Sequence, residues 1–416
     1  MDRRRLSPRG RSWRLRLVLV TAMILWSLSA TASDDGGDCI AVAGQCVAAA
    51  PTAASVFHNP ARLPLSVSRF RVGMVGGTHA VAMSGCKEPL CGGYRRPEGL
   101  TAVQAGWSTK LTTKLGVGVG LHTPTATLVR IVAAESSAPH WPLLDGYGQR
   151  FRLQAGFGYR LHPTLSLGVA AHIFASIGSR LTLATSGEQV DRAGVVIQLG
   201  PTVRAIAALH WRPTTSWSLA LVWRQATGVP YVIPAEVAVT SLARADLTLS
   251  QIAHSTPGQL DLAAGWRRPW GGVEAGIQWS QWSRLEEVAP TLRVATSGAL
   301  IDGLGLNQVT SVAPTRGWPA LRDTLAIGLS AWRNVTSELS LRCGWRWRPS
   351  PLPNLNQGPL ITDQHRLAVG AALDITGPWR ALVSGQWIIH PNRRRDDGVV
   401  FGGESLIGAF AIQRRL

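Results

Sequence analysis

Apolar and polar residues alternate with a period of two along most of the chain. From Phe151 to His162, odd positions hold aromatic residues, leucine or alanine, and even positions hold Arg, Gln, Gly or His. The alternation recurs over residues 273–280 and 338–348. A period of two predicts strands with one apolar and one polar face. Soluble sandwiches and membrane barrels both contain such strands, so alternation alone does not distinguish them.

Connections between the predicted strands fall into two length classes. Six are short, at 111–114, 160–164, 211–216, 267–272, 333–337 and 376–379. Longer stretches lie near 85–98, 124–147, 177–192, 226–257, 285–322, 349–364 and 390–402. A first strand at 69–84 and a last at 404–416 bring the count to 14. This segregation predicts an all-β fold, a 14-stranded antiparallel transmembrane β-barrel over residues 69–416, with the short turns in the periplasm.

The lengths of the apolar runs and the positions of the tryptophans are both consistent with a barrel. Beyond residue 32 there is no apolar run of 18 residues, so no membrane-spanning helix is predicted. Fifteen of the 17 tryptophans follow residue 32. Five lie beside the short turns, where an interfacial aromatic belt belongs: Trp211, Trp217, Trp266, Trp270 and Trp379. Burial in a soluble core is the alternative for any one of them.

Residues 1–32 have the organisation of a signal peptide. They hold seven arginines and one aspartate, an apolar run from Leu17 to Leu28, and the sequence Ala30-Thr31-Ala32. This pattern predicts export through the Sec pathway and cleavage after residue 32. A membrane anchor is the alternative, although the apolar run is shorter than the roughly 20 residues needed to span a bilayer.

Removal of residues 1–32 lowers the net charge from +18 to about +12. The remaining arginines are scattered singly among alternating segments, which does not favour a nucleic-acid partner. Arginines at a barrel rim would instead face anionic lipopolysaccharide. We therefore expect outer-membrane lipids and lipopolysaccharide as surroundings, and a location in the outer membrane of a Gram-negative bacterium.

The five cysteines fit an oxidising compartment. Cys39 and Cys46 bracket a six-residue segment, and Cys86 and Cys91 flank a four-residue, loop-like segment. Two local disulfides are predicted, and Cys343 then has no partner cysteine. Five unpaired thiols are the alternative, because the sequence does not fix connectivity.

Residues 33–68 separate the predicted cleavage site from the first strand. They are mostly small and apolar, and no charge occurs between Cys39 and Arg62. A solvated tail would be more polar, whereas a plug inside a barrel needs small residues that pack closely. We therefore predict an N-terminal plug, or hatch, over residues 33–68. Asn59-Pro60 alone is a common turn signal.

The run AAAPTAASVFHNPARL, which contains Phe57, resembles the hatch of the long-chain fatty acid transporter (FadL/TodX) family of outer-membrane transporters of hydrophobic compounds. Members carry an Asn-Pro-Ala motif before the barrel, and Asn59, Pro60 and Ala61 match it. Further short matches follow in family order at 115–124, 150–172, 276–285 and 341–353. The resemblance covers nearly the whole mature chain.

The resemblance implies a monomeric 14-stranded barrel that a hatch occludes. It also implies uptake of long-chain fatty acids or aromatic hydrocarbons, with lateral release into the membrane beside a kinked third strand. The third strand is predicted at 115–131. A kink is compatible with Gly116, Gly118, Gly120 and Pro124; the alternative is that these glycines make room for the plug.

The chain departs from the family at two points. It ends in Leu416 rather than in the usual aromatic residue, which bears on recognition by the barrel-assembly machinery. The loops that hold the family's substrate-binding residues are too divergent for those residues to be carried over. The hatch motif does match, so Asn59, Pro60, Ala61 and Phe57 are expected to act in gating. Candidate substrate contacts must come from other residues of this chain.

A fatty-acid carboxylate needs a cationic partner, because an unpaired buried charge is unfavourable. Alternation places five arginines on the inner face: Arg152, Arg204, Arg224, Arg342 and Arg346. Arg224 and Arg342 are the first candidates for the carboxylate site. The alternative is a lumenal charge network with Glu274 that stabilises the barrel.

Catalytic and cofactor motifs are lacking. The sequence has no G-x-S-x-G or H-E-x-x-H motif and no Gly-rich phosphate loop, and its histidines lack metal-ligand spacing. We therefore predict no enzymatic activity, no catalytic residues, no metal and no cofactor. A barrel that serves protein secretion or surface attachment, without small-molecule transport, is the alternative function.

Overall fold

The computed structural model describes most of the chain from residue 37 onward. The described residues are 37–48, 54–85, 100–125, 151–186, 189–239, 244–284, 291–304, 309–312, 321–353, 361–396 and 398–416. The predicted signal peptide, Cys86 and Cys91 lie outside them. Among the described residues, no helix is long and apolar enough to cross a membrane.

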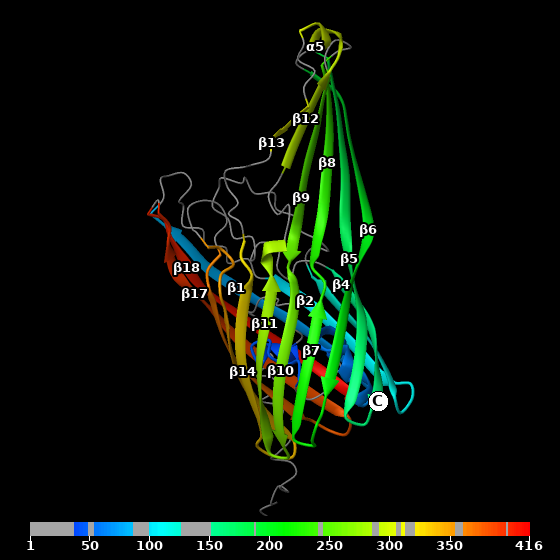
Figure 1. Ribbon diagram of the computed structural model, residues 1–416, viewed down its shortest axis with the longest axis vertical. Coiled ribbons are helices and arrows are strands. Elements are labelled where there is room, and N and C mark those ends of the chain that lie inside the picture. The colour runs from blue at the N-terminus through cyan, green and yellow to red at the C-terminus, as the bar shows by residue number, and fades with distance from the viewer. Residues whose placement is uncertain are drawn as a thin grey trace, which may run out of the picture.

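Most of the described strands form a closed antiparallel barrel (Figure 1). Its wall has 14 strands. They are β1 (Arg69–Ser84), β2 (Leu100–Lys110), β3 (Leu115–Pro124), β4 (Arg152–His162), β5 (Leu165–Ser186), β6 (Gln189–Trp211), β7 (Trp217–Arg224), β10 (Gly258–Arg268), β11 (Gly271–Gln281), β14 (Thr324–Asn334), β15 (Leu339–Arg348), β16 (Gln364–Asp374), β17 (Trp379–Arg394) and β18 (Val400–Arg415).

The first and last strands close the wall. β1 pairs with β18 without interruption from Arg69 opposite Arg415 to Ser84 opposite Val400. On its other side β1 lies against β2, and the Ser68 and Thr109 hydroxyls are 2.6 Å apart there. Closure leaves no sheet edge at the level of the membrane, where unpaired backbone groups would be strongly unfavourable.

Six tight turns gather at one end of the barrel, at the bottom of Figure 1. The turn residues are 111–114, 163–164, 212–216, 269–270, 335–338 and 375–378. Thr112, Thr214 and Thr336 each accept backbone N–H groups through their hydroxyls, which stabilises three of these turns locally. The predicted short turns, and with them the 14-stranded antiparallel barrel, are confirmed.

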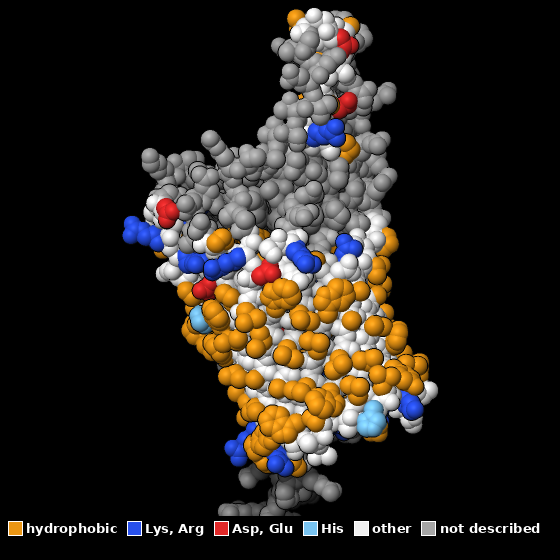
Figure 2. Space-filling model, in the orientation of Figure 1, with side chains coloured by type: hydrophobic (Ala, Val, Ile, Leu, Met, Phe, Trp, Pro, Cys, Tyr) orange, Lys and Arg blue, Asp and Glu red, His pale blue; other side chains and the backbone are white. Residues whose placement is uncertain are grey.

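Alternation places apolar side chains on the outer surface of the wall. Along β14, Leu325, Ile327 and Leu329 are exposed while Thr324 and Ala326 are buried. Figure 2 shows the outward apolar residues as a band across the visible face of the barrel, with charged residues above and below it. At the short-turn end, exposed tryptophans border this belt: Trp211, Trp217, Trp270 and Trp379. An apolar band between aromatic girdles is the surface that a bilayer requires.

The end opposite the tight turns carries a sheet extension. β5 and β6 continue beyond the wall, and β5 pairs in parallel with β8 (Thr227–Val239). The sheet goes on through β9 (Arg244–Thr256), β12 (Thr291–Ser297) and β13 (Val309–Val312), with α5 (Ala299–Gly303) at the tip in Figure 1. The longer connections predicted at 177–192, 226–257 and 285–322 therefore contain strand residues of their own. These connections pair with one another, which turn composition alone does not reveal.

The described N-terminal residues lie on the inner side of the wall, drawn in blue in Figure 1. They include α2 (Gly37–Ile40), α3 (Ser55–His58) and the 3-10 helix η2 (Pro60–Leu65). We call residues 37–48 and 54–66 the lumen segment. Its residues are almost all buried, and η2 contacts β2, β3, β4, β5 and β6. A second 3-10 helix, η3 (Trp282–Arg284), follows β11.

Candidate functional site

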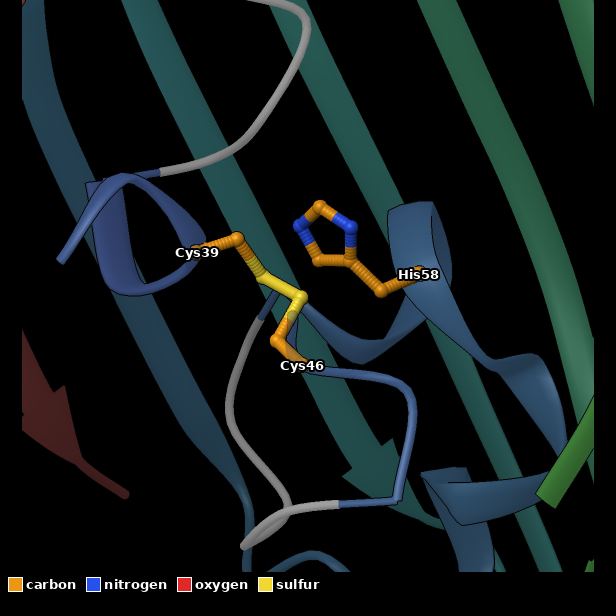
Figure 3. Close-up of side chains that lie close together, drawn as sticks. All are labelled: Cys39, Cys46 and His58. Atoms are coloured by element: carbon orange, nitrogen blue, oxygen red, sulfur yellow. A yellow bond between two sulfur atoms is a disulfide. The ribbon is translucent and has the colours of Figure 1, made fainter. Parts of the chain in front are cut away.

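A disulfide joins Cys39 to Cys46 at the start of the lumen segment, with a Cα–Cα distance of 5.5 Å. Figure 3 shows the bond closing a small loop beside His58. Cys343 carries a free thiol on the outer face of β15. The second predicted pair, Cys86 with Cys91, falls on undescribed residues and stays a prediction.

His58 lies next to this disulfide. The two sulfur atoms and a ring nitrogen of His58 lie within 4.8 Å of one another, a spacing that suits metal ligands. The two sulfurs are bonded to each other, however, and cysteine binds a metal as a thiolate. In this oxidised state the two cysteines therefore close the loop covalently and do not offer thiolate ligands to a metal.

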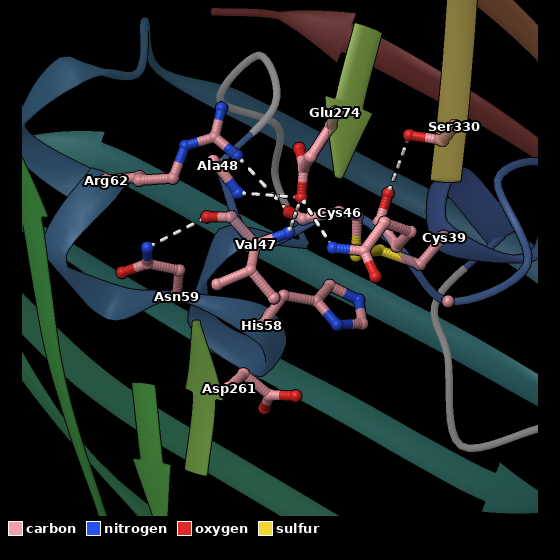
Figure 4. The surroundings of a disulfide bond; sticks show 12 residues. Cys39, Cys46, Val47, Ala48, His58, Asn59, Arg62, Asp261, Glu274 and Ser330 are labelled. Carbon is pink, nitrogen blue, oxygen red and sulfur yellow. Dashed lines mark hydrogen bonds between the residues drawn. A yellow bond between two sulfur atoms is a disulfide. The ribbon is translucent and has the colours of Figure 1, made fainter. Parts of the chain in front are cut away.

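The loop is bound to the wall through Glu274 on β11 (Figure 4). Its Oε1 accepts hydrogen bonds from the backbone N–H of Val47 at 2.8 Å and of Ala48 at 3.0 Å. Oε1 also accepts from Gln45 Nε2 at 3.3 Å. The Glu274 side chain is 1% exposed. A buried carboxylate needs such donors, so Glu274 and the loop stabilise each other.

Asn59 links the two described parts of the lumen segment. Its Oδ1 accepts from the backbone N–H of Ala61 at 3.0 Å, and its Nδ2 donates to the carbonyl of Val47 at 2.9 Å. The first contact caps η2, and Pro60 occupies the first position of that helix, where its missing N–H is harmless. The Asn-Pro-Ala sequence thus fixes a bend and binds the disulfide loop with one side chain.

Arg62 adds a third connection. Its Nη1 donates to the carbonyl of Cys46 at 3.4 Å. The side chain is 3% exposed, and burial lowers the pKa of its guanidinium from 12.5 to about 9, an effect that the nearby Glu274 opposes. Arg62 therefore remains protonated at neutral pH and belongs to the same buried group as Glu274.

Glycines on the inner face of β3 let the lumen segment approach the wall. A Cβ on Gly116 would clash with the backbone at Leu63, and one on Gly120 would clash with the ring of Phe57. A Cβ on Gly118 would lie 2.9 Å from the Leu63 side chain. The structure thus favours the interpretation that these glycines make room for the segment.

β3 does not bend away from its neighbours within the described residues. It pairs with β2 continuously from Gly116 to Pro124 and with β4 from Leu115 to His122. Pro124 ends the β2 ladder opposite Ala102. The register of β3 is therefore regular between Leu115 and Pro124, and the predicted kink stays a prediction. The predicted residues 126–131 of this strand are undescribed.

A chamber lies between the lumen segment and the wall, with a volume of about 980 Å³, part of it open to solvent. Its lining includes Phe57, His58, Val47 and Gly44 of the lumen segment. Six arginines and one acidic residue, Asp261, are among the wall residues that line it. The arginines are Arg152, Arg204, Arg224, Arg346, Arg348 and Arg366.

The two arginines predicted to receive a carboxylate lie in different surroundings. Arg224 lines the chamber, where its Nη1 forms an ion pair with Asp261 Oδ2 and its Nη2 donates to the carbonyl of His58 at 2.7 Å. Arg342 points inward on β15 but is not among the residues that line the chamber. The structure therefore does not bring Arg224 and Arg342 together. Their substrate role stays a prediction.

Sequence reasoning missed three charged residues of the chamber lining: Asp261, Arg348 and Arg366. Alternation could have placed both Asp261 and Arg366 on the inner face, because Asp261 lies between Leu260 and Leu262 and Arg366 precedes the outward Leu367. It could not show that β10 and β15 bring Asp261 close to Arg346, whose Nη2 lies 3.9 Å from Asp261 Oδ1. Glu274 was predicted in a lumenal charge network, and its described hydrogen-bond donors are Gln45, Val47 and Ala48.

Comparisons with solved structures identify proteins that share this fold. No protein-family model matches the sequence, and no curated protein matches it significantly. Solved structures do match. The Pseudomonas putida toluene transporter TodX superposes with a TM-score of 0.59 at 13% identity, over 92% of this chain and 99% of that chain. The chain shares its fold.

Two further structures agree. A Pseudomonas aeruginosa FadL homologue matches with a TM-score of 0.58 at 11% identity, and the Ralstonia pickettii toluene transporter TbuX with 0.56 at 12%. Each match covers 92% of this chain and 98% of that chain. The resemblance to the FadL/TodX family is therefore confirmed at the level of the fold. TodX and TbuX are toluene transporters.

Proposed function

We propose that this chain is an outer-membrane channel for the uptake of hydrophobic small molecules, long-chain fatty acids or aromatic hydrocarbons. One observation carries the proposal: a closed barrel with an apolar outer belt holds its own N-terminal segment against the inner wall. A porin for polar solutes has an open, water-filled lumen. A channel for apolar solutes benefits from one, because an open pore would leak water and ions.

In this proposal the lumen segment is the plug, and Phe57, Asn59, Pro60 and Ala61 take part in gating. The chain is exported through the Sec pathway, folded by the barrel-assembly machinery and works as a monomer. The short turns face the periplasm, and the sheet extension faces the cell exterior, among lipopolysaccharide. Long outer elements with short periplasmic turns are the usual arrangement of such barrels.

Uptake by intact cells tests the proposal. A host that lacks its own transporter would express the full chain, and labelled oleate and toluene would be supplied separately. We expect uptake of one of them well above that of a vector control. The amount of folded barrel is followed by heat-modifiable migration. Folded, surface-exposed protein without uptake of either compound would contradict transport and favour the role in secretion or attachment.

We further propose that solute leaves sideways, at the outer end of β3. The described ladder between β3 and β4 ends at the pair His122–Arg152, whereas that between β2 and β3 reaches Ala102–Pro124. Pro124 has no N–H to give to a neighbouring strand. A lateral exit suits an apolar molecule, which gains about 0.8 kcal/mol per CH₂ on entering lipid.

A pair of engineered disulfides tests the lateral exit. Cysteines at His122 and Arg152 would bridge β3 to β4, because directly opposed residues of an antiparallel pair lie at a suitable distance. We expect this bridge to block uptake and a reductant to restore it. Cysteines at Ser340 and Ala372, opposed on β15 and β16, provide the control bridge. Equal uptake with both bridges closed would contradict lateral release.

A further inference from the structure

Two arginines share one outward-facing row at the short-turn end of the wall. Arg268 on β10 is the register partner of Gly271 on β11, and Gly271 is in turn the partner of Arg333 on β14. Register partners point to the same face of a sheet, and Val273, two residues beyond Gly271, is exposed on the outer face. Arg268 and Arg333 are both exposed. Two guanidinium groups on the outside of the barrel are thus separated by a residue without a side chain.

The gap between the two arginines suits one small anionic group. Neighbouring strands lie about 4.8 Å apart, so the Cα atoms of Arg268 and Arg333 are roughly 10 Å apart across β11. Their long side chains can approach one ligand from both sides, and Gly271 leaves the space between them open. Within the described part of the chain, neither arginine forms an ion pair with a carboxylate.

The pair lies at the border of the apolar belt. The guanidinium carbon of Arg268 is 5.5 Å from the centroid of the Trp266 ring, and Trp270 in the adjoining turn is 57% exposed. Interfacial tryptophans of this kind lie at the level of lipid headgroups. Toward the middle of the belt, Val273 and Leu329 continue the apolar outer surface. In Figure 2, basic side chains lie along the lower border of the apolar band, at the end of the barrel where the tight turns are in Figure 1.

The short-turn end is basic as a whole. Among the described residues, the six tight turns and the three residues on either side of each carry eight basic and two acidic side chains. The basic residues are Lys110, Lys114, Arg160, Arg212, Arg267, Arg268, Arg333 and Arg380. Of the two acidic residues, Asp374 accepts from Arg380 through both carboxylate oxygens, at 2.6 and 2.7 Å. A surface of this charge attracts anionic lipid headgroups.

We propose that Arg268 and Arg333 bind the headgroup of an anionic phospholipid in the periplasmic leaflet, one that carries a phosphate and no amine. The planar fork of each guanidinium matches phosphate oxygens, and two forks from opposite sides can hold one phosphate. A zwitterionic headgroup would bring an ammonium group into the same basic surroundings, where it is repelled. The acyl chains lie along the exposed apolar side chains of β11 and β14, Val273 and Leu329 among them.

This lipid site goes beyond the transport of hydrophobic molecules. It rests on the proposed orientation, with the short turns in the periplasm, and does not depend on what the barrel transports. The source of the phosphate is a membrane lipid rather than a free anion, because the two arginines face the bilayer side of the wall at the edge of the apolar belt.

Native mass spectrometry of the purified protein in a neutral detergent tests the proposal. Phosphatidylglycerol, phosphatidylethanolamine and phosphatidylcholine with identical acyl chains are added one at a time over a range of concentrations. We expect the first phosphatidylglycerol adduct to saturate at a concentration about tenfold lower than the adducts of the two zwitterionic lipids, because only its headgroup has a net negative charge. Saturation of all three lipids at the same concentration would contradict the proposal.

Variants locate the site. The double variant Arg268→Gln, Arg333→Gln should lose the preference for phosphatidylglycerol, and each single variant should weaken it. Arg284→Gln is the control for the single variants, because it removes an exposed arginine from η3, beyond the opposite end of β11, and should leave the preference unchanged. Lysine at both positions keeps the charge without the fork and should bind more weakly than wild type.

One further result would overturn the site. It is a preference for phosphatidylglycerol in the double glutamine variant equal to that of wild type, in protein whose heat-modifiable migration shows a folded barrel. None of these measurements involves uptake of a solute, so failure of the lipid site is distinguishable from failure of the proposed transport.

Discussion

Glu274 accepts a hydrogen bond from the backbone N–H of Val47 at 2.8 Å, although 227 positions separate the two residues. The contact joins the middle of the barrel wall to the loop that the Cys39–Cys46 disulfide closes. The same carboxylate oxygen accepts from Ala48. The buried Glu274 side chain thus binds the lumen segment to the wall, while Asn59 joins two parts of the lumen segment to each other (Figure 4).

Removal of the Glu274 carboxylate should release the loop and leave the barrel folded. In Glu274→Leu the N–H groups of Val47 and Ala48 lose their acceptor, and a buried polar group without a partner costs about 1–3 kcal/mol. Amide hydrogen exchange at these two residues should accelerate at least tenfold. Glu274→Gln, which retains an acceptor oxygen, should show a smaller effect. Unchanged exchange in Glu274→Leu would mean that the loop is held by other contacts.

Substitution of the Asn-Pro pair should change transport without unfolding the wall. Asn59→Ala together with Pro60→Gly removes the cap of η2 and the contact with Val47, whereas the barrel ladder is formed elsewhere. Uptake of a labelled long-chain fatty acid or aromatic hydrocarbon should then change several-fold. The barrel should keep its heat-modifiable migration. If uptake is unchanged in correctly assembled protein, Asn59 and Pro60 have no part in gating.

Enlargement of Gly116 should displace the lumen segment from β3. Its added side chain would meet the backbone of Leu63, which cannot move aside as a flexible side chain would. Gly116→Val should therefore increase proteolysis within residues 54–66. Gly303→Val is the control, because a Cβ there has no neighbour within 4 Å. Equal protection in both variants would contradict close packing of β3 against this segment.

Opposite ends of the barrel should face opposite compartments. An epitope inserted near Pro89, or in the extension near Gly303, should be labelled on intact cells. An epitope in the turn near Pro213 should be labelled only after the outer membrane is permeabilised. The physical basis is the separation of short turns from long connections, since long loops are found on the outer side. The reverse labelling pattern would invert the proposed orientation.

The cysteine pairs can be examined by mass spectrometry under non-reducing conditions. A peptide that links Cys39 to Cys46 is expected from the structure. A link between Cys86 and Cys91 is expected from their spacing and an oxidising destination. Free Cys86 and Cys91 would remove the second bridge. Replacement of Cys39 and Cys46 by serine should accelerate amide exchange at Val47, because the loop loses its covalent closure.

The strands and tight turns of the barrel wall follow from the sequence pattern. Strand β1 was predicted with the bounds Arg69–Ser84 that the structure has, and the six turns are at the predicted places. These features are local: a two-residue period fixes the face of each side chain, and turn residues fix where a strand ends. The lumen-facing side of Arg152, Arg204, Arg224 and Arg346 followed from the same period.

Which inward-facing residues contact one another depends on the three-dimensional arrangement of the strands. Strand tilt and register set the height of each side chain in the lumen, and one sequence contains no measure of either. Hence Arg224 is paired with Asp261, Arg342 lies outside the chamber, and Glu274 binds the backbone of the lumen segment. The extension was missed for the same reason. β5 and β8 pair in parallel only because the barrel brings distant connections side by side.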